Sequence, residues 1–375
     1  MSGHGFFVAS TGQNIGKTTT SLGLVAGLLK RKIKAGFMKP VGQEHIQVSS
    51  GESVDKDVVL FKEHFHLKDS YEHMSPVLIP SGFTKDFLDQ KIDLESLQDK
   101  IITSYNHISS NNSFVVVEGT GHVGVGSIVG MNNAQVAKLL NLPVILIASG
   151  GLGSAFDELT LNKMLCDHFG VKILGVILNR VKKEKKEMIH HYMSKALKCW
   201  NIPLLGCMPF DPLLNNPTMQ DLEYLFETSL ITAEEHRLRH FESIRLVATS
   251  IEVYRESIMS HQIIITPANR EDIILATISK QWELKQISSK MDLASGLILT
   301  GDYPPRHFII EQLQKAGIPM LYTKEHSHSA MQMLSTFTAK IRKEDQAKIQ
   351  EAIEVVDSHI DFDKLLSLVS ASTSV

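Results

Sequence analysis

The sequence contains very little cysteine, with only Cys166, Cys199 and Cys207 among its 375 residues. The number is odd and no C-x-x-C spacing occurs, which argues against both a disulfide framework and a zinc site. We therefore expect all three cysteines to be thiols of the core.

An excess of charge of one sign and long apolar runs are also missing. The formal net charge of −3 gives no electrostatic reason to expect nucleic acid or an anionic membrane as a partner. No apolar run is long enough to span a bilayer, and Met1–His4 lacks the basic flank of a signal peptide. These absences predict a cytoplasmic protein.

The most informative stretch lies near the start of the sequence. The apolar run Phe6–Ser10 enters the loop Thr11–Gly16, and Lys17-Thr18-Thr19 then leads into the helical apolar spacing of residues 20–29. This order is typical of a phosphate-binding loop, in which backbone N–H groups and a helix N-terminus converge on phosphate oxygens. Lys17 would reach the β- and γ-phosphates, and the Thr18 hydroxyl would ligate Mg²⁺.

The loop departs from the pattern G-x-x-x-x-G-K-[ST] because Thr11 stands at the first glycine position and Gly12 follows it. A chance Gly-Lys-Thr at a helix start is the alternative interpretation. The strand before the loop and the helix after it favour the phosphate-binding interpretation.

Three charged residues elsewhere are candidates for the same site. Lys39 ends a strand before Pro40, Asp57 begins a helix over residues 58–64, and Glu118 ends the apolar strand 114–117. A solvated lysine and a helix-capping aspartate are the alternatives for Lys39 and Asp57. A carboxylate at the tip of a buried strand is costly without a partner, and Mg²⁺ supplies one for Glu118. The glycines at 119–126 predict a flexible loop on the substrate side.

Strands and helices alternate along the first half of the chain. Further strands are expected at residues 34–39, 143–149, 171–178 and 203–207, with helices between them. This alternation predicts an α/β fold with a mostly parallel P-loop NTPase-type sheet covered by helices on both faces. A second, smaller α/β domain should follow.

We expect four segments in the chain. They are a nucleotide-binding domain at 1–207, a proline-rich linker at 208–235, an α/β domain at 236–355, and a C-terminal helix and tail at 356–375. The second domain should begin with a helix at residues 240–260 and contain strands at 262–265, 296–300 and 319–322.

Several motifs together resemble the dethiobiotin synthetase-like P-loop proteins, in which threonine also replaces the first loop glycine. These motifs are Thr11-Gly12, Gly16-Lys17-Thr18, Lys39-Pro40-Val41, Glu118-Gly119 and Asn179-Arg180. The resemblance implies ATP and Mg²⁺ as cofactors, with Lys17 and Lys39 holding the γ-phosphate and a carboxyl species. It also implies that Thr18, Asp57 and Glu118 bind the metal and that Asn179 recognises adenine. The expected nucleotide-binding residues are Thr11, Gly12, Asn14, Gly16, Lys17, Thr18, Thr19 and Asn179.

Two features are more similar to the N-terminal part of long bacterial phosphate acetyltransferases than to dethiobiotin synthetase itself. Gly42-Gln43-Glu44 stands where a dethiobiotin synthetase has a small Ser/Thr-Gly pair. Residues 210–340 resemble the DRTGG domain of those enzymes. Asn269-Arg270 stands where that domain has Asp-Arg, and Thr300-Gly301-Asp302 stands where it has Thr-Gly-Gly, so each motif is altered in one residue. We expect a stand-alone protein that stops before any acetyltransferase catalytic domain.

Three functions follow from these resemblances. The first is a nucleotide-responsive regulatory protein, whose partner would be a small metabolite or another protein. The second is an ATP-dependent ligase that activates a carboxylate as an acyl phosphate, and the third is a binding module with a vestigial loop. Intact Lys17 and Thr18 argue against the third. Related folds often place active sites at a two-fold interface, so we expect a homodimer.

Overall fold

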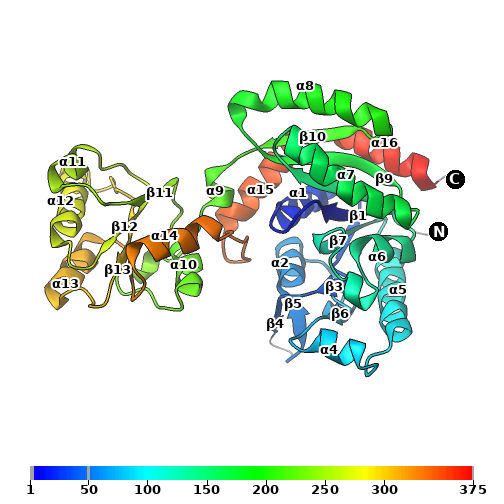
Figure 1. Ribbon diagram of the computed structural model, residues 1–375, viewed down its shortest axis with the longest axis horizontal. Helices are drawn as coiled ribbons and strands as arrows, with labels where there is room; N and C mark the ends of the chain where they lie inside the picture. Colours follow the sequence, from blue (N-terminus) through cyan, green and yellow to red (C-terminus); the bar gives the residue numbers. More distant parts are fainter. Residues whose placement is uncertain (1–3, 49–50, 374–375) are drawn as a thin grey trace. The chain divides into compact units, whose positions relative to one another are not determined.

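The computed structural model describes residues 4–48 and 51–373, and divides the chain into two compact units (Figure 1). The first unit is Met1–Phe210 together with Ile341–Val375, and the second is Asp211–Lys340. Expectations that concern residues 1–3, 49–50 and 374–375 lie outside the described part of the chain.

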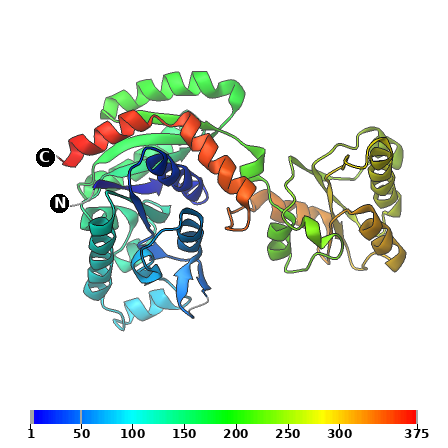
Figure 2. The same ribbon diagram turned by 180° about the vertical axis from the view of Figure 1, so that it is seen from behind.

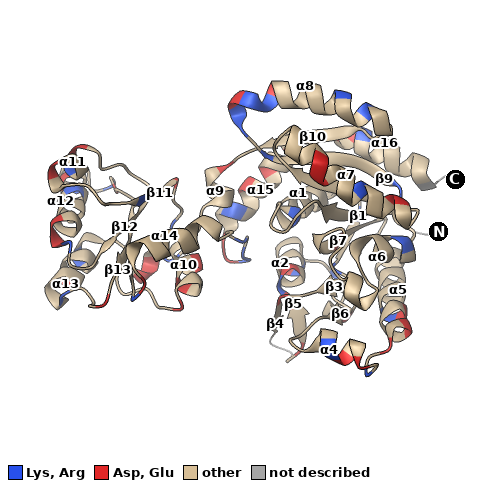
Figure 3. Cartoon of the chain, in the orientation of Figure 1, with Lys and Arg blue, Asp and Glu red and all other residues tan. Residues whose placement is uncertain are grey.

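A six-stranded parallel sheet forms the centre of the first unit, in the order β10-β9-β8-β1-β7-β2. The strands are β1 (His4–Ser10), β2 (Ala35–Met38), β7 (Phe114–His122), β8 (Val144–Ser149), β9 (Ile173–Val181) and β10 (Leu204–Pro209). Nearly continuous apolar runs form them, as expected for parallel strands buried on both faces. The predicted mostly parallel sheet is confirmed, and its strands are largely free of Lys, Arg, Asp and Glu (Figure 3).

Helices cover both faces of this sheet, as predicted. A Cβ atom added to Gly36 of β2 would press on Ile108 of α5 (Leu94–Asn111), on one face. The next residue, Phe37, stacks on Phe61 of α2 (Lys56–Phe65) at a ring-centroid distance of 3.6 Å, on the other face. Successive strand residues point to opposite faces, so α5 and α2 lie on opposite sides.

The described helices of the first unit come from both of its segments. They are α1 (Lys17–Lys30), α2 (Lys56–Phe65), α3 (Tyr71–Met74), α4 (Phe83–Leu88), α5 (Leu94–Asn111), α6 (Asn133–Leu139), α7 (Gly153–His168), α8 (Lys186–Leu197), α15 (Gln346–His359), α16 (Phe362–Thr373), and the 3₁₀ turns η1 (Ser127–Val129), η2 (Lys183–Lys185) and η3 (Lys198–Trp200). Two small sheets, β3 (Val41–Gly42) with β6 (Val77–Leu78) and β4 (His45–Gln47) with β5 (Ser53–Asp55), lie outside the main sheet.

The C-terminal helices α15 and α16 return to the first unit and pack beside α1 (Figure 2). Gly23 and Gly27 of α1 make this possible, because a Cβ atom on either would overlap with Val356 of α15 or Phe362 of α16. Close approach of two helices needs small residues at the contact. The expected second domain at 236–355 therefore ends too late, since residues 341–355 belong to the first unit.

The second unit has a parallel sheet in the order β11-β12-β13-β14. Its elements are β11 (Ser243–Leu246), β12 (Gln262–Pro267), β13 (Gly296–Thr300), β14 (Met320–Thr323), α9 (Pro212–Asn215), α10 (Met219–Leu225), η4 (Glu234–His236), α11 (Ile251–Glu256), α12 (Glu271–Ile287), α13 (His307–Ala316) and α14 (Ser327–Thr336). Ile264 faces a core with α12 and α13, whereas Ile263 and Ile265 face one with α10 and α14. The sheet is thus buried on both sides.

Two expectations for this unit are wrong. Residues 211–235 are part of its core and not a linker, since Met219, Leu222 and Phe226 are buried against the sheet. The expected helix at 240–260 contains strand β11 and only a short helix, α11, because β11 completes the sheet edge beside β12.

Two further observations concern the whole described chain. Cys166 and Cys207 are buried as expected, but Cys199 is exposed in the turn η3 and is not a core thiol. Within residues 4–48 and 51–373, every helix is too short or too polar to cross a membrane.

Candidate functional site

The loop between β1 and α1 ends at a glycine with a left-handed backbone. Gly16, at the N-terminus of α1, has a φ of 99°, in the left-handed region that favours glycine. A Cβ atom at this position would also overlap with the amide nitrogen of Asn179. No side chain among the described residues caps α1, so the backbone amides of its first turn are left for a ligand.

Thr18 and Glu118 are brought together across two neighbouring elements. The Thr18 hydroxyl donates to Glu118 Oε1 at 3.1 Å. Strand β7, which carries Glu118, pairs with β1, and Val8 is the register partner of Glu118. The sheet order therefore delivers a carboxylate from residue 118 to the loop that follows β1.

Lys39 lies in the middle of three carboxylates. Its ammonium contacts Asp57, and lies 3.3 Å from Asp55 Oδ1 and 3.7 Å from Glu118 Oε1. Only 8% of Lys39 is exposed. Burial by itself lowers the pKa of Lys39, but the carboxylates of Asp57, Asp55 and Glu118 outweigh burial and raise it. The solvated-lysine alternative is therefore wrong.

Asp55 is a member of this group that was missed from the sequence. Its side chain caps α2 by accepting a hydrogen bond from the Asp57 backbone at 2.9 Å. Asp57 itself lies in the first turn, with its carboxylate directed at Lys39. The spacing Asp55-x-Asp57 at a helix start was the available signal, because a cap and a first-turn acid are neighbours in space.

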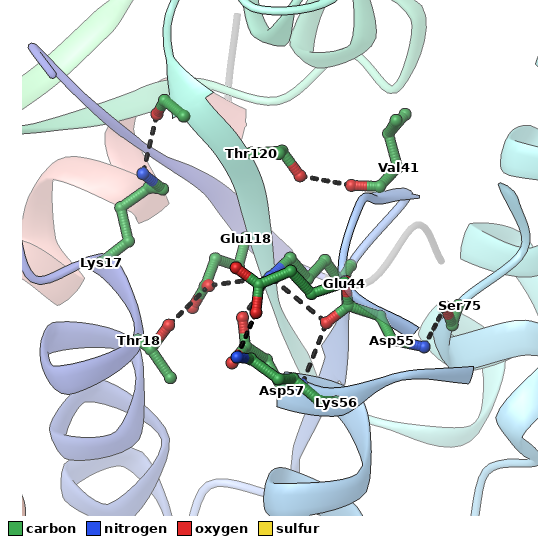
Figure 4. Close-up of polar contacts among 12 residues, drawn as sticks. Lys17, Thr18, Val41, Glu44, Asp55, Lys56, Asp57, Ser75, Glu118 and Thr120 are labelled. Carbon is green, nitrogen blue, oxygen red and sulfur yellow. Dashed lines mark hydrogen bonds and ion pairs between the residues drawn. The ribbon is translucent and has the colours of Figure 1, made fainter. Parts of the chain in front are cut away.

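The four oxygen-bearing side chains converge from different elements. Figure 4 shows Thr18 of α1, Glu118 of β7, Asp55 of β5 and Asp57 of α2 directed toward one another. Burial raises the pKa of Glu118 to about 7 and that of Asp55 to about 6, although Lys39 opposes both shifts. Such shifts are concentrated at functional sites.

These residues fit a divalent cation in their chemistry. Asp55 Oδ2 and Glu118 Oε2 are buried and have no hydrogen-bond partner among the described residues. Buried carboxylate oxygens and a threonine hydroxyl are the hard donors that Mg²⁺ prefers. Nevertheless, in the described residues no group of three or more His, Cys, Asp or Glu side chains is arranged around a metal position. The ammonium of Lys39 lies among the carboxylates instead.

Lys17 points away from the carboxylates (Figure 4). Its Nζ donates to Ser10 Oγ at 3.0 Å and to the backbone oxygen of Gly121 at 2.7 Å. Burial lowers the pKa of Lys17 to about 8, with Glu118 acting in the opposite direction. Gly121 belongs to the glycine-containing segment after Glu118, so this segment contacts the loop lysine directly.

Helix α7 fixes the first residue of the loop. The Thr11 hydroxyl donates to Glu158 Oε2 at 2.9 Å, and Asn162 Nδ2 donates to the Thr11 backbone oxygen at 3.2 Å. Asn162 Oδ1 also accepts from Val123 N at 3.1 Å, which joins the loop to the segment after β7. Neither Glu158 nor Asn162 was identified from the sequence, since an i, i+4 pair on a helix resembles any polar helix face.

The remaining predicted nucleotide-binding residues also lie at the loop. The Gly12 backbone oxygen accepts a hydrogen bond from Ser10 Oγ at 2.6 Å, and Asn14 has a φ of 58°. Thr19 lies half-buried in the first turn of α1. Asn179, at the end of β9, donates from Nδ2 to the backbone oxygen of Ile15 at 2.8 Å. The structure thus places the amide of Asn179 on the loop itself.

The altered motifs of the second unit follow β12 and β13. Arg270 pairs with Asp272 of α12 and donates to the Thr249 backbone oxygen at 3.1 Å. Gly301 has a φ of 110°, and the Thr300 hydroxyl hydrogen-bonds with Ser327 Oγ at 2.6 Å. These contacts stabilise the loops within the unit.

A glycine-containing loop between β1 and α1, a lysine and threonine at the helix start, and an acid on the adjacent strand define a P-loop NTPase-like domain. The family model described as "AAA domain" (AAA_26) matches residues 4–218, and the model described as "DRTGG domain" matches residues 223–337. The chain belongs to the AAA_26 family and carries a DRTGG domain after the P-loop domain.

Curated relatives cover almost the whole chain. Phosphate acetyltransferase of Nitratidesulfovibrio vulgaris is 25% identical over 96% of this chain and 51% of the relative. The enzyme of Pseudomonas putida is 29% identical over 95% and 50%, and that of Escherichia coli 21% over 96% and 52%. The chain is therefore related to phosphate acetyltransferases and spans about half the length of these relatives.

The chain is similar over part of its length to two solved structures. MinD cell division protein of Aquifex aeolicus is 15% identical over 56% of this chain and 84% of that chain, with a TM-score of 0.35. The CBS and DRTGG domains of Clostridium perfringens pyrophosphatase, complexed with the activator diadenosine tetraphosphate, are 15% identical over 44% and 74%, with a TM-score of 0.28.

Proposed function

We propose that this chain binds ATP with Mg²⁺ at residues 11–19 and acts as a nucleotide-responsive regulatory protein related to phosphate acetyltransferase. The observation that carries the proposal is the hydrogen bond between Thr18 and Glu118, which joins the loop to an acid on the neighbouring strand. A threonine hydroxyl and an acid so placed suit the Mg²⁺ that accompanies a bound triphosphate. The DRTGG domain is the part that would respond.

Each residue of the site has a role in this proposal. The amides of the loop and of the first turn of α1 would bind phosphate oxygens, and Lys17 would exchange Ser10 and Gly121 for the β- and γ-phosphates. Thr18, Asp57 and Glu118 would hold Mg²⁺, which supplies positive charge beside the phosphates. Asn179 would read adenine after releasing the Ile15 carbonyl.

The direct test is the affinity of the full chain for Mg·ATP, measured by calorimetry. We expect Lys17→Ala to weaken binding by about 10- to 100-fold, the value of one lost hydrogen bond to a charged group. Lys185→Ala is the matched control, since Lys185 is an exposed lysine of η2. Equal affinities of the wild type and Lys17→Ala would contradict the proposal.

Glu118→Gln separates the metal from the nucleotide. We expect this variant to bind ATP in EDTA as the wild type does, and to lose most of the gain in affinity that Mg²⁺ gives, because an amide is a poor replacement for a carboxylate ligand. The variant should remain folded, since the amide keeps the shape of the side chain. An unchanged Mg²⁺ effect would remove Glu118 from the metal site.

An ATP-dependent ligase that forms an acyl phosphate is the second candidate. It is favoured by the position of Lys39, whose ammonium lies within 4 Å of the carboxylate that contacts Thr18. Positive charge beside a transferring phosphoryl group is what such a reaction needs. ADP release that is stimulated by a carboxylate and an amine, and that disappears in Lys17→Ala, would favour the ligase. Tight ATP binding with negligible turnover would favour the regulator.

A further inference from the structure

The cluster of three carboxylates at the site already surrounds a positive charge from the chain itself, the ammonium of Lys39. Lys39 contacts Asp57, Asp55 and Glu118, which come from three different elements. Asp55 and Glu118 are 0% and 1% exposed, and each has a buried oxygen without a hydrogen-bond partner in the described residues. Figure 4 shows Asp55, Asp57 and Glu118 directed toward one another, and the two unpartnered oxygens remain as donors for a cation.

Electrostatics decides what can occupy this point. Buried carboxylates that close to one another repel strongly, and a positive charge among them favours their ionised forms. An ammonium supplies that charge without any metal. A divalent cation would have to displace Lys39 or bind beside it against the repulsion between like charges.

Asp55 is placed to hold the ammonium. Its Oδ1 lies 3.3 Å from Lys39 Nζ and also accepts the 2.9 Å hydrogen bond from the Asp57 backbone. Its own backbone nitrogen donates to Ser75 Oγ at 3.2 Å, and a Cβ atom on Gly42 would come within 2.7 Å of its Oδ2. Oδ1 of Asp55 therefore links Lys39 to the start of α2, and Ser75 holds the Asp55 backbone.

We propose that Lys39 is a tethered cation that occupies the cluster of three carboxylates in the nucleotide-free protein. Asp55 is the positioning residue that holds Lys39 there. Mg²⁺ enters only when the phosphates of a nucleotide offer Lys39 new partners. This inference rests on the proposed metal site at Thr18, Asp57 and Glu118. Its consequence is that the free metal ion binds poorly while the metal–nucleotide complex binds well. The protein then responds to the complex and not to the concentration of the free metal ion.

The test is the binding of Mn²⁺ alone to the nucleotide-free full chain, followed by the electron paramagnetic resonance signal of the free ion. We expect Lys39→Met to bind Mn²⁺ at least about tenfold more tightly than the wild type, since removal of one charge at this distance is worth more than 1.4 kcal/mol in a buried site. Lys39→Arg, which keeps the charge, should resemble the wild type. Lys56→Met is the matched control, because Lys56 lies between Asp55 and Asp57 in the sequence but pairs with Glu44.

The opposite results would overturn the inference. Wild type that binds Mn²⁺ as tightly as Lys39→Met, or Lys39→Arg that binds as tightly as Lys39→Met, would show that the ammonium does not exclude the ion. A second measurement covers the case in which Lys39→Met is destabilised. Mn²⁺ should then raise its melting temperature by several degrees more than that of the wild type, and the absence of such a rise would also count against the inference.

The role of Asp55 has its own readout. In the wild-type background, Asp55→Asn keeps a cap for α2 but weakens the interaction that holds Lys39. The variant should still bind Mg·ATP. Its Lys39 amine should become more reactive toward a lysine-acetylating reagent, and mass spectrometry detects the acetylated lysine. An unchanged reactivity would remove Asp55 as the anchor. If the wild type does not bind Mg·ATP but the Mn²⁺ results are as expected, the proposed function is wrong and the role of Lys39 as a tethered cation is supported. If the wild type binds Mg·ATP but the Mn²⁺ results are not as expected, only this inference is wrong.

Discussion

At the scale of single residues, the loop lysine is held in an environment that lowers its pKa. Lys17 is largely desolvated, and its pKa falls from 10.5 to about 8. Glu118 and Asp57 raise the pKa and Lys39 lowers it, but burial is the largest effect. A bound phosphate would add negative charge beside the ammonium and raise the pKa again.

This shift predicts a pH dependence of nucleotide affinity. Below about pH 8 Lys17 is protonated in the free protein, and affinity should be flat. Above that value the free protein loses the proton and binding must restore it, so affinity should fall, approaching tenfold per pH unit. Calorimetric titrations between pH 7.5 and 9.5 check this, because the phosphates of ATP are already ionised there.

Lys17→Arg is the control for this prediction, since guanidinium stays protonated over the whole range. Its affinity should be independent of pH even if it is weaker than that of the wild type. A wild-type profile that is flat up to pH 9.5 would contradict the assigned environment of Lys17.

At the scale of elements, two glycines of α1 decide how closely the C-terminal helices approach. Gly23 faces Val356 of α15, and Gly27 faces the ring of Phe362 at the start of α16. The Arg31 guanidinium lies 4.1 Å from the centroid of the same ring. Because α1 also carries Lys17 and Thr18, the packing of α15 and α16 bears directly on the helix that begins the site.

Gly27→Ala should therefore destabilise the protein although alanine is the better helix former. The added Cβ would overlap with Phe362, and overpacking of a core typically costs about 1–3 kcal/mol. Urea denaturation measures the loss. Gly153→Ala, at the start of α7, is the control, because no atom lies within 4 Å of a Cβ there.

A compensating change tests the cause of that loss. Phe362→Leu in the Gly27→Ala background removes the ring atoms that the Cβ would meet, so the double variant should lose less stability than the sum of the two single changes. Additive effects would show that the contact is not the reason.

At the scale of the whole molecule, the chain forms the first unit from two separate segments. Residues 211–340 lie in the sequence between β10 and α15, and have their own cores on both faces of their own sheet. The first unit instead depends on residues 341–375. Gly206 of β10 illustrates this, because a Cβ there would overlap with the backbone of His359, and Gly206 forms a bridge with Ile360.

Fragments should reflect this division. Residues 211–340 expressed alone should unfold cooperatively, since their buried apolar side chains are satisfied within the unit. Residues 1–210 alone should aggregate or bind a hydrophobic dye, because the surface covered by Val356 and Phe362 is then exposed. Addition of residues 341–375 through a flexible linker should restore a folded unit. A monomeric, cooperatively folded 1–210 fragment would refute the dependence.

The sequence by itself determined the features that depend on residues close together in the chain. The strand–loop–helix of residues 6–30, the parallel α/β class and the placement of Lys39 and Asp57 at element ends all follow from apolar spacing and backbone preferences, which act over a few residues. The expected strand end at Glu118 is wrong, because β7 continues to His122. Tertiary structure alone decided which side chains meet. The capping Asp55 became a partner of Lys39, residues 211–235 became core and not linker, and residues 341–373 packed beside α1, because each outcome depends on surfaces that lie far apart in the chain and match only after folding.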